Sequence, residues 1–363
     1  MTAPGETALG ATGLGEPAPD GTASGVAGPV RVAEHLNQAL HGLLAADPGL
    51  HLLGEDVTDP YGGAFKITKG LSTAYGDRVR STPLSEGGIV GVGAGLALAG
   101  DRAIVEIMFG DFVALAFDQL LNFASKSTAM YGRPVDLPLV VRCPSGGRRG
   151  YGPTHSQSPQ KHLVGVPGLS LFELTPFHDA GRLFGHMLSL ARPCVLFEDK
   201  VLYTRRMCRD GVVDDLFGYE LVGDAPGWAV VRADGLTDHD AVVVAPGGLT
   251  DRALAAMREL LLEHEVACAL LVPAAIYPLD LGPVLPYLAS ARAICVAEDG
   301  TAGGTWGAEV ARLLYPALWG SLDRPIALVS GADSIIPSAP HLEREVTVQD
   351  TTIRDAVLAA LGS

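Results

Sequence analysis

The chain has few cysteines, and their arrangement excludes two kinds of stabilising framework. Only five occur among the 363 residues, they lie far apart, and none forms a Cys-x-x-Cys pair. An odd number of scattered cysteines argues against both a disulfide framework and a zinc site. We therefore expect a protein of a reducing compartment and assign it to the cytoplasm.

Positive charge and long apolar runs are also scarce. The 26 Lys and Arg residues face 41 Asp and Glu residues, which gives a formal net charge of −15. Nucleic-acid binding needs clustered basic side chains, so we exclude nucleic acid as a partner. No apolar stretch reaches the roughly 18 residues of a membrane-spanning helix. The N-terminus also lacks the basic start and apolar core of a secretory signal.

What the sequence does contain is an alternation of short apolar strands with helical patterns. Apolar residues make up 48% of the chain. Nearly continuous apolar runs indicate strands that are buried on both faces, as in parallel sheets covered by helices. We therefore predict an α/β fold of two domains, each a mainly parallel sheet flanked by helices. The predicted strands are 50–54, 102–108, 137–143, 169–174, 194–198, 241–244, 267–272 and 293–297, and the predicted helices are 32–44, 87–100, 117–130, 179–190 and 251–264.

The domain boundaries follow from local composition. Residues 1–28 are Gly, Ala, Pro, Thr and acidic residues without periodicity, so we predict a flexible tail. We place the first domain at 29–208 and the second at 229–363. The stretch 209–228, rich in Gly and Asp, is predicted to be the linker between them.

The first candidate for chemistry is Glu86, in the run Thr-Pro-Leu-Ser-Glu at 82–86. It opens an uncharged stretch of Gly, Ala, Val and Leu that has the character of a closely packed helix. A carboxyl at the mouth of such an element is desolvated, which favours proton-sharing work. The pattern equally fits a Glu that is stabilised by the helix dipole.

Two further segments follow predicted strands, where ligand sites of parallel sheets lie. The Gly-rich loop 146–157 carries His155, a candidate acid or base, and the adjacent pair Arg148 and Arg149, which suit a carboxylate or phosphate. The segment 108–112 ends in Phe112, which could offer an aromatic face to a flat ring. A solvated surface loop and an ordinary core aromatic are the simpler interpretations of the two segments.

Taken together and in order, these segments resemble the beta subunit of the first, decarboxylating component of 2-oxoacid dehydrogenases, of the pyruvate and branched-chain type. The resemblance runs from about residue 30 to the C-terminus. The matching segments are Gly-Glu-Asp-Val at 54–57, Gly-Gly-Ala-Phe at 62–65, Thr-Pro-Leu-Ser-Glu at 82–86, Ala-Phe-Asp-Gln at 116–119, His-Ser-Gln-Ser at 155–158, Val-Pro-Gly-Leu at 166–169, Pro-Cys-Val-Leu-Phe-Glu at 193–198, Glu-Asp-Gly at 298–300, Gly-Gly at 303–304 and Gly-Ala-Asp at 331–333.

The resemblance implies a pyrimidine-binding domain followed by a transketolase-type C-terminal domain, and thiamin diphosphate as cofactor. Glu86 would hydrogen-bond the ring nitrogen N1′ of the aminopyrimidine, Phe112 would stack on that ring, and Leu84 would line the same pocket. His155 would assist proton transfer at the substrate or the reductive acylation of a lipoyl group. The resemblance also implies a potassium ion held by main-chain oxygens between Gly168 and Lys200.

One expected motif is missing. In this family the diphosphate and Mg²⁺ are held by Gly-Asp-Gly with an Asn about 30 residues later. Gly-Asp-Gly never occurs in this chain, and its only two Asn residues, Asn37 and Asn122, fall in predicted helices. Octahedral Mg²⁺ needs such oxygen ligands. The resemblance therefore implies that an alpha subunit supplies the metal ligands within an α2β2 heterotetramer, and that a lipoyl or similar carrier accepts the acyl unit.

The pair Arg148 and Arg149 departs from the family pattern and adds positive charge beside His155. We take it as a candidate contact to an anionic or phosphorylated substrate. Two functions stay open at this point. The first is decarboxylation of a 2-oxoacid, and the second is a split transketolase-like reaction that moves a two-carbon ketol unit from a ketose phosphate to a carrier or aldehyde.

Overall fold

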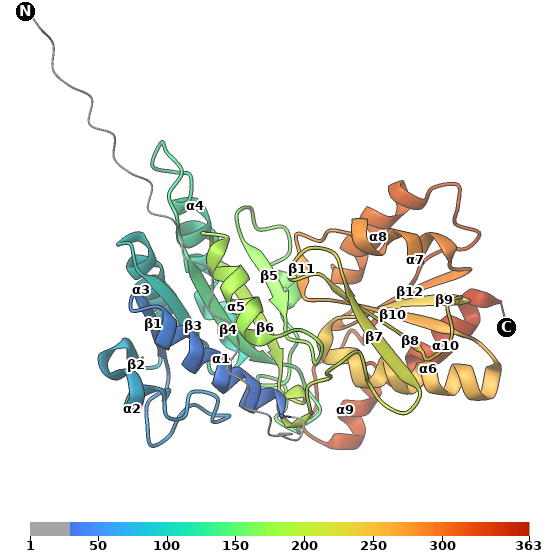
Figure 1. Ribbon diagram of the computed structural model, residues 1–363, viewed down its shortest axis with the longest axis horizontal. Coiled ribbons are helices and arrows are strands. Elements are labelled where there is room, and N and C mark those ends of the chain that lie inside the picture. Colours follow the sequence, from blue (N-terminus) through green and yellow to red (C-terminus); the bar gives the residue numbers. More distant parts are fainter. Residues whose placement is uncertain (1–29, 363) are drawn as a thin grey trace, which may run out of the picture.

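The computed structural model describes residues 30–362, and the predicted tail at 1–28 lies outside this range. Two sheets stand side by side, each with helices packed on its faces (Figure 1). This confirms the predicted α/β class. The helices are α1 (Val32–Ala46), α2 (Leu71–Tyr75), α3 (Glu86–Leu98), α4 (Ser125–Ser127), α5 (Ala180–Ser189), α6 (Thr250–His264), α7 (Leu285–Ser290), α8 (Trp306–Leu318), α9 (Pro340–Val346) and α10 (Asp350–Leu361).

The strands fall into two sheets of seven and six members. The first has the order β11-β5-β6-β4-β3-β1-β2 and the second β13-β12-β9-β10-β8-β7. The strands are β1 (Leu50–Gly54), β2 (Val79–Ser81), β3 (Arg102–Glu106), β4 (Leu139–Ser145), β5 (Ser170–Glu173), β6 (Cys194–Asp199), β7 (Phe217–Val222), β8 (Trp228–Ala233), β9 (Ala241–Val244), β10 (Cys268–Pro273), β11 (Ala275–Tyr277), β12 (Ala293–Thr301) and β13 (Ala327–Gly331).

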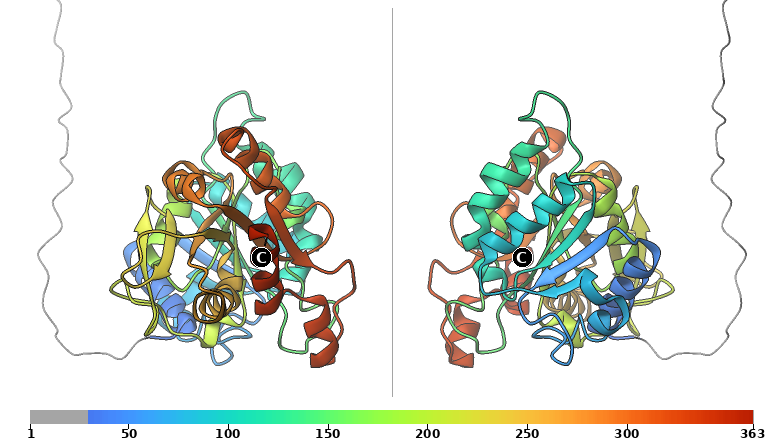
Figure 2. Two further views of the ribbon diagram at one scale, coloured as in Figure 1. Left: turned by 90° about the vertical axis from the view of Figure 1, so that its right-hand side faces the viewer. Right: turned by 90° about the vertical axis from the view of Figure 1, so that its left-hand side faces the viewer.

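In the first sheet all pairs except β5–β11 are parallel, so its inner strands are buried on both faces. Successive side chains of a strand point to opposite faces. Ile104 accordingly packs with α1 and α5, whereas its neighbour Val105 packs with α3. Figure 2 (right) shows this arrangement from the free edge, with teal helices on one side of the sheet and blue helices on the other.

Two short edge strands were not predicted from sequence. The predicted linker at 209–228 contains β7, which pairs in antiparallel fashion with β8 at the edge of the second sheet. Strand β11 belongs to the C-terminal half of the chain, yet it pairs with β5 and extends the first sheet. Edge strands are short and half exposed, so they lack the continuous apolar run by which the inner strands were found.

The predicted helix at 117–130 is also different. A π-helical segment, η3 (Gln119–Ala124), is followed by only one turn of α-helix, α4, and the chain then leaves the body of the molecule in a loop. Within the described residues, no helix combines the length and the apolar character that crossing a membrane would require.

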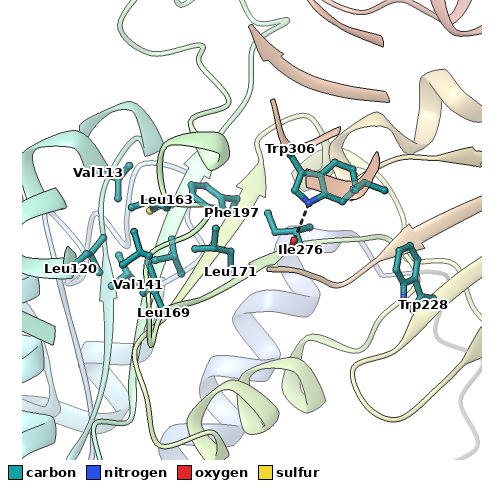
Figure 3. Packing of buried hydrophobic residues seen from close by; sticks show 14 of the residues in the cluster. Val113, Leu120, Val141, Leu163, Leu169, Leu171, Phe197, Trp228, Ile276 and Trp306 are labelled. Atoms are coloured by element: carbon teal, nitrogen blue, oxygen red, sulfur yellow. Dashed lines mark hydrogen bonds between the residues drawn. The ribbon is translucent and has the colours of Figure 1, made fainter. Parts of the chain in front are cut away.

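The two domains share one apolar core. A single cluster of buried side chains runs from Leu171 and Phe197 of the first sheet to Trp228 and Trp306 of the second (Figure 3). The indole Nε1 of Trp306 donates a hydrogen bond to the carbonyl of Ile276, 2.9 Å away. Because buried apolar area is the main stabilising term, this continuity fixes how the two sheets meet.

A small, strongly acidic cavity lies at the same junction. It is lined by four carboxyl groups, those of Glu173, Asp199, Glu298 and Asp299. Glu173 accepts hydrogen bonds from the backbone N–H of Gly248 and from the Gln160 side chain, each at 2.9 Å. Burial still raises the pKa of Glu173 from 4.5 to about 8. The folded chain therefore holds a proton here that the unfolded chain releases.

This raised pKa predicts that stability falls with rising pH. Unfolding releases the Glu173 proton between about pH 4.5 and about pH 8. The loss of stability caused by the buried Glu173 is therefore absent below that window and complete above it. Glu173→Gln mimics the protonated form. We expect it to raise the melting temperature at pH 9, by an amount that corresponds to a few kcal/mol at most (about 1.4 kcal/mol per pKa unit), and to change it little at pH 5. Calorimetry at both pH values, with the exposed Glu263→Gln as control, measures this. Equal gains at both pH values would contradict it.

Candidate active site

Glu86 is the first residue of α3 and is buried, although the chain just before it is open to solvent. Its exposed fraction is 8%, compared with 80% for Leu84. The helix starts in close contact with the 3-10 segment η2 (Gly110–Ala116), where a Cβ on Gly87 would lie 3.2 Å from the carbonyl oxygen of Leu115. Small residues at the start of α3 therefore allow the carboxyl of Glu86 to be enclosed beneath η2.

A second buried carboxyl, Glu55, is coupled to Glu86. It directly follows β1, is 3% exposed, and its Oε1 has no hydrogen-bond partner within the described residues. Burial and, next, the charge of Glu86 raise the pKa of Glu55 to about 7, although the backbone N–H of Met108 donates to its carboxylate. A carboxyl with a pKa near neutrality, such as Glu55, is suited to accepting or giving up a proton at physiological pH. Glu55 was not singled out as a candidate from sequence.

His155 lies among aromatic rings that come from two other segments. Its imidazole contacts Phe109 and Phe112 edge to face, with ring centroids 4.7 and 5.1 Å apart. Tyr151 contacts the same Phe109. No hydrogen bond joins His155 to Glu86 within the part of the chain described; η2, which carries Phe112 and packs on α3, connects them. The structure thus brings Phe112 and His155 together, with Glu86 one layer away.

The loop that carries His155 is tied down by Asp111. The Oδ1 of Asp111 accepts hydrogen bonds from the backbone N–H of Gln157 at 3.1 Å and from its side-chain amide at 3.0 Å. Lys200 is buried nearby, with its ammonium 5.6 Å from the centroid of Phe109. Burial lowers the pKa of this lysine to about 8. These polar groups position the loop and create a charged layer beneath the aromatic cluster.

Arg148 and Arg149 make contacts within the chain. The Arg148 guanidinium forms an ion pair with Asp199 at 2.7 Å and a hydrogen bond to the carbonyl of Gly248, and its backbone N–H donates to Glu343. Arg149 donates to the carbonyl of Lys200 at 2.5 Å. Arg148 therefore joins the two domains, and its charge is compensated by Asp199. Its predicted contact to substrate gains no support from this arrangement.

Comparison with known proteins accounts for most of the chain. Residues 29–205 match the family model "Transketolase, pyrimidine binding domain", and residues 232–353 match "Transketolase, C-terminal domain". The pyruvate dehydrogenase E1 component subunit beta-1 of Oryza sativa is 33% identical, over 93% of this chain and 88% of the relative. The chain belongs to the thiamin diphosphate-dependent E1 beta subunit family of 2-oxoacid dehydrogenases. The resemblance found in the motifs is thereby confirmed.

Other members of the E1 beta family give similar values. The pyruvate dehydrogenase E1 beta subunit of Leifsonia xyli is 32% identical over 88% of this chain and 93% of its own length. The 3-methyl-2-oxobutanoate dehydrogenase beta subunit of Mycobacterium tuberculosis is 30% identical, with 85% of each chain covered. Among solved structures, a split-gene transketolase described as an inactive beta4 tetramer has a TM-score of 0.69 at 18% identity, covering 91% of this chain and 97% of its own. Leishmania mexicana transketolase has a TM-score of 0.63 at 14% identity, and the match covers 93% of this chain and 46% of the transketolase chain. These two show the common fold.

Three large apolar side chains on the segments next to Glu86 are exposed to solvent. Leu84, Val92 on α3 and Leu115 on η2 are 80%, 54% and 64% exposed. Large exposed apolar side chains are typical of a surface that another chain covers.

No part of the described chain offers a site for a divalent metal. It contains no group of three or more metal-ligating His, Cys, Asp or Glu side chains. Both Asn residues are engaged locally: Asn37 donates to the carbonyls of Ile67 and Lys69, and Asn122 bonds Asp118 and Lys126. The enclosed Glu86 and the aromatic cluster fit the flat pyrimidine end of the cofactor, whereas the described residues hold no side-chain cluster for the Mg²⁺ that accompanies its diphosphate.

Proposed function

We propose that this chain is the beta half of a thiamin diphosphate-dependent dehydrogenase that decarboxylates a 2-oxoacid and passes the acyl unit to a lipoyl or similar carrier. The observation that carries the proposal is the enclosed Glu86 at the start of α3, coupled to Glu55 and on a helix that packs against η2, the segment that carries Phe112. Family membership gives the reaction class. The geometry supports the role of each residue.

The residues of this chain would hold the cofactor and transfer protons. None of them would act as the nucleophile. When bound, thiamin diphosphate supplies the nucleophilic carbon that adds to the 2-oxoacid carbonyl. Glu86 would hydrogen-bond N1′ of the aminopyrimidine, and low polarity around the carboxyl strengthens such a bond. Phe112 would stack on the ring and Leu84 would close the pocket. His155, half buried among aromatic rings, would move a proton at the substrate or at the carrier thiol.

We propose an alpha subunit as the obligatory partner, in an α2β2 heterotetramer. It would cover the apolar surface formed by Leu84, Val92 and Leu115, and it would supply the Mg²⁺ and diphosphate ligands. A potassium ion held by backbone oxygens between Gly168 and Lys200 stays part of the proposal. So does a cytoplasmic location, for which the reduced state of all five cysteines is the support.

The donor distinguishes this function from a transketolase-like one. The chain, purified with its alpha-type partner and supplied with thiamin diphosphate and Mg²⁺, is expected to release CO2 from a 2-oxoacid. The measurement is CO2 release together with reduction of an artificial electron acceptor. If a ketose phosphate were consumed, and no 2-oxoacid released CO2, the decarboxylating function would be wrong and the two-carbon transfer would replace it.

The dependence on a partner is tested separately. The isolated chain is expected to show no stoichiometric calorimetric binding of thiamin diphosphate with Mg²⁺, because the described residues hold no side-chain cluster for the metal ion that the diphosphate needs. The complex with the alpha subunit should bind one cofactor per beta chain. Tight binding to the isolated chain would contradict the shared site.

A further inference from the structure

A basic pocket stands out in this acidic chain. It has a volume of about 780 Å³ and lies between α1, the loop 65–70 and the segment around Tyr203. Four cations line it (Arg31, Lys66, Lys69 and Arg149), against one carboxylate, Glu34. The whole chain carries a formal net charge of −15, so this concentration of positive charge runs against the composition.

The four cations of the basic pocket have no carboxylate partner within 4 Å among the described residues. Many other arginines pair with an acid, as Arg148 does with Asp199. The single carboxylate in the pocket, Glu34, accepts a hydrogen bond from the backbone N–H of Arg31. Uncompensated like charges in a concave surface repel one another and attract an anion. The pocket thus holds an excess of positive charge, with four cations against the single carboxylate of Glu34.

The loop that carries the two lysines is fixed in place. The side-chain amide of Asn37 donates to the carbonyls of Ile67 and Lys69, at 2.7 and 3.0 Å. At the far end of the loop, Asp59 accepts hydrogen bonds from the backbone N–H of Gly70 and from Thr73. These bonds hold the pKa of Asp59 well below its usual range. A loop anchored at both ends provides a preformed site, which lowers the entropic cost of binding.

The basic pocket shares a wall with the aromatic cluster around His155. Phe65 lines the pocket and contacts Phe109 with ring centroids 5.8 Å apart, and Phe109 is the ring 4.7 Å from His155. Arg149 lines the pocket from the same loop that carries His155. A ligand anchored in the pocket therefore sits two rings away from the candidate acid or base.

We propose that the basic pocket binds the phosphate of a phosphate ester whose organic part extends toward the candidate active site. Two arginines and two lysines suit a phosphate dianion, because a guanidinium can bind its oxygens in pairs and an ammonium adds charge. The ester is either the phosphopantetheine arm of a carrier or a ketose phosphate donor. The first deepens the proposed function and rests on it for the reaction that the ester would serve, whereas the second belongs to the two-carbon transfer that was weighed against it.

The test measures anion binding to the full-length chain alone, without cofactor or partner. Inorganic phosphate, fructose 6-phosphate and 4′-phosphopantetheine are titrated by calorimetry and ³¹P NMR, beside fructose, pantetheine and succinate. The variants are Lys69→Gln, Arg31→Gln and the double substitution. Both side chains are exposed and neither forms an ion pair with another part of the described chain. Lys126→Gln, which removes an exposed lysine outside the pocket, is the matched control.

We expect phosphate to bind, one of the two esters to bind more tightly than phosphate, and each pocket substitution to weaken binding on the order of tenfold. Added salt should weaken binding too. The preferred ester identifies the source of the phosphate. Unchanged affinity in the double variant, equal binding of succinate, or no gain of either ester over phosphate would overturn the inference. Each of these failures leaves CO2 release by the complex untouched, so the two proposals fail separately.

Discussion

Replacing Glu86 with Gln is expected to reduce turnover of the assembled complex by a factor of roughly 10²–10⁴, the usual contribution of a positioned acid or base. The amide keeps the shape of the side chain and can still donate a hydrogen bond, but it cannot exchange a proton with its partner. Glu86 is 8% exposed, so water cannot take over that role. The measurement is kcat with saturating thiamin diphosphate and Mg²⁺.

The neighbouring carboxyl provides an independent readout. The charge of Glu86 is the second-largest cause of the raised pKa of Glu55, so this pKa, about 7 in the native chain, should fall in the Gln variant while burial keeps it above 4.5. Glu263→Gln, on the exposed end of α6, should change neither kcat nor this pKa. Native turnover in the Glu86→Gln complex would contradict the catalytic assignment.

The sequence predicted the inner frame of the fold because that frame is local. A strand buried on both faces must be a continuous apolar run, and β1 was bounded correctly at 50–54 for this reason. Strand β7 carries Gly, Tyr and Glu at half-exposed positions, so its pattern resembles a linker. Strand β11 spans three residues, and its partner β5 lies about a hundred residues earlier. Pairing over that distance has no local signal.

The site shows the same division between local and distant information. Glu86 was found because its motif is contiguous and its helix starts where the motif ends. Arg148 could be read only as an unpaired charge, because its partners Asp199 and Glu343 lie 51 and 195 residues further along the chain. Glu55 stands in a recognisable segment, but its importance comes from its coupling to Glu86 in space. One signal was available: Glu55 also directly follows a buried strand.

A buried ion network in the first sheet should make the fold sensitive to the loss of any one of its members. Arg142 of β4 is fully buried and contacts Glu106 of β3 at 2.5 Å and Glu198 of β6 at 2.7 Å. The hydroxyl of Tyr203 donates a further hydrogen bond to Glu198, at 2.7 Å. One guanidinium thus joins three adjacent strands and pairs with two carboxyl groups, and burial raises the pKa of one of them, Glu106. Tyr203 also lines the basic pocket, so its hydrogen bond to Glu198 links the ion network to the wall of that pocket.

Replacing Arg142 with Met is therefore expected to lower the free energy of unfolding by about 3–5 kcal/mol, because removal of one member leaves buried charges uncompensated. The matched control is Arg102→Met, which breaks the Arg102–Asp47 pair at the surface, where the arginine is 49% exposed. That variant should lose about 1 kcal/mol or less. Urea unfolding of both variants gives the comparison. Adding Glu106→Gln and Glu198→Gln to Arg142→Met should restore part of the loss, since the stranded charges are then gone. Equal stability of the two single variants would show that the carboxyls are already protonated in the native chain, and that the network is not held by charge.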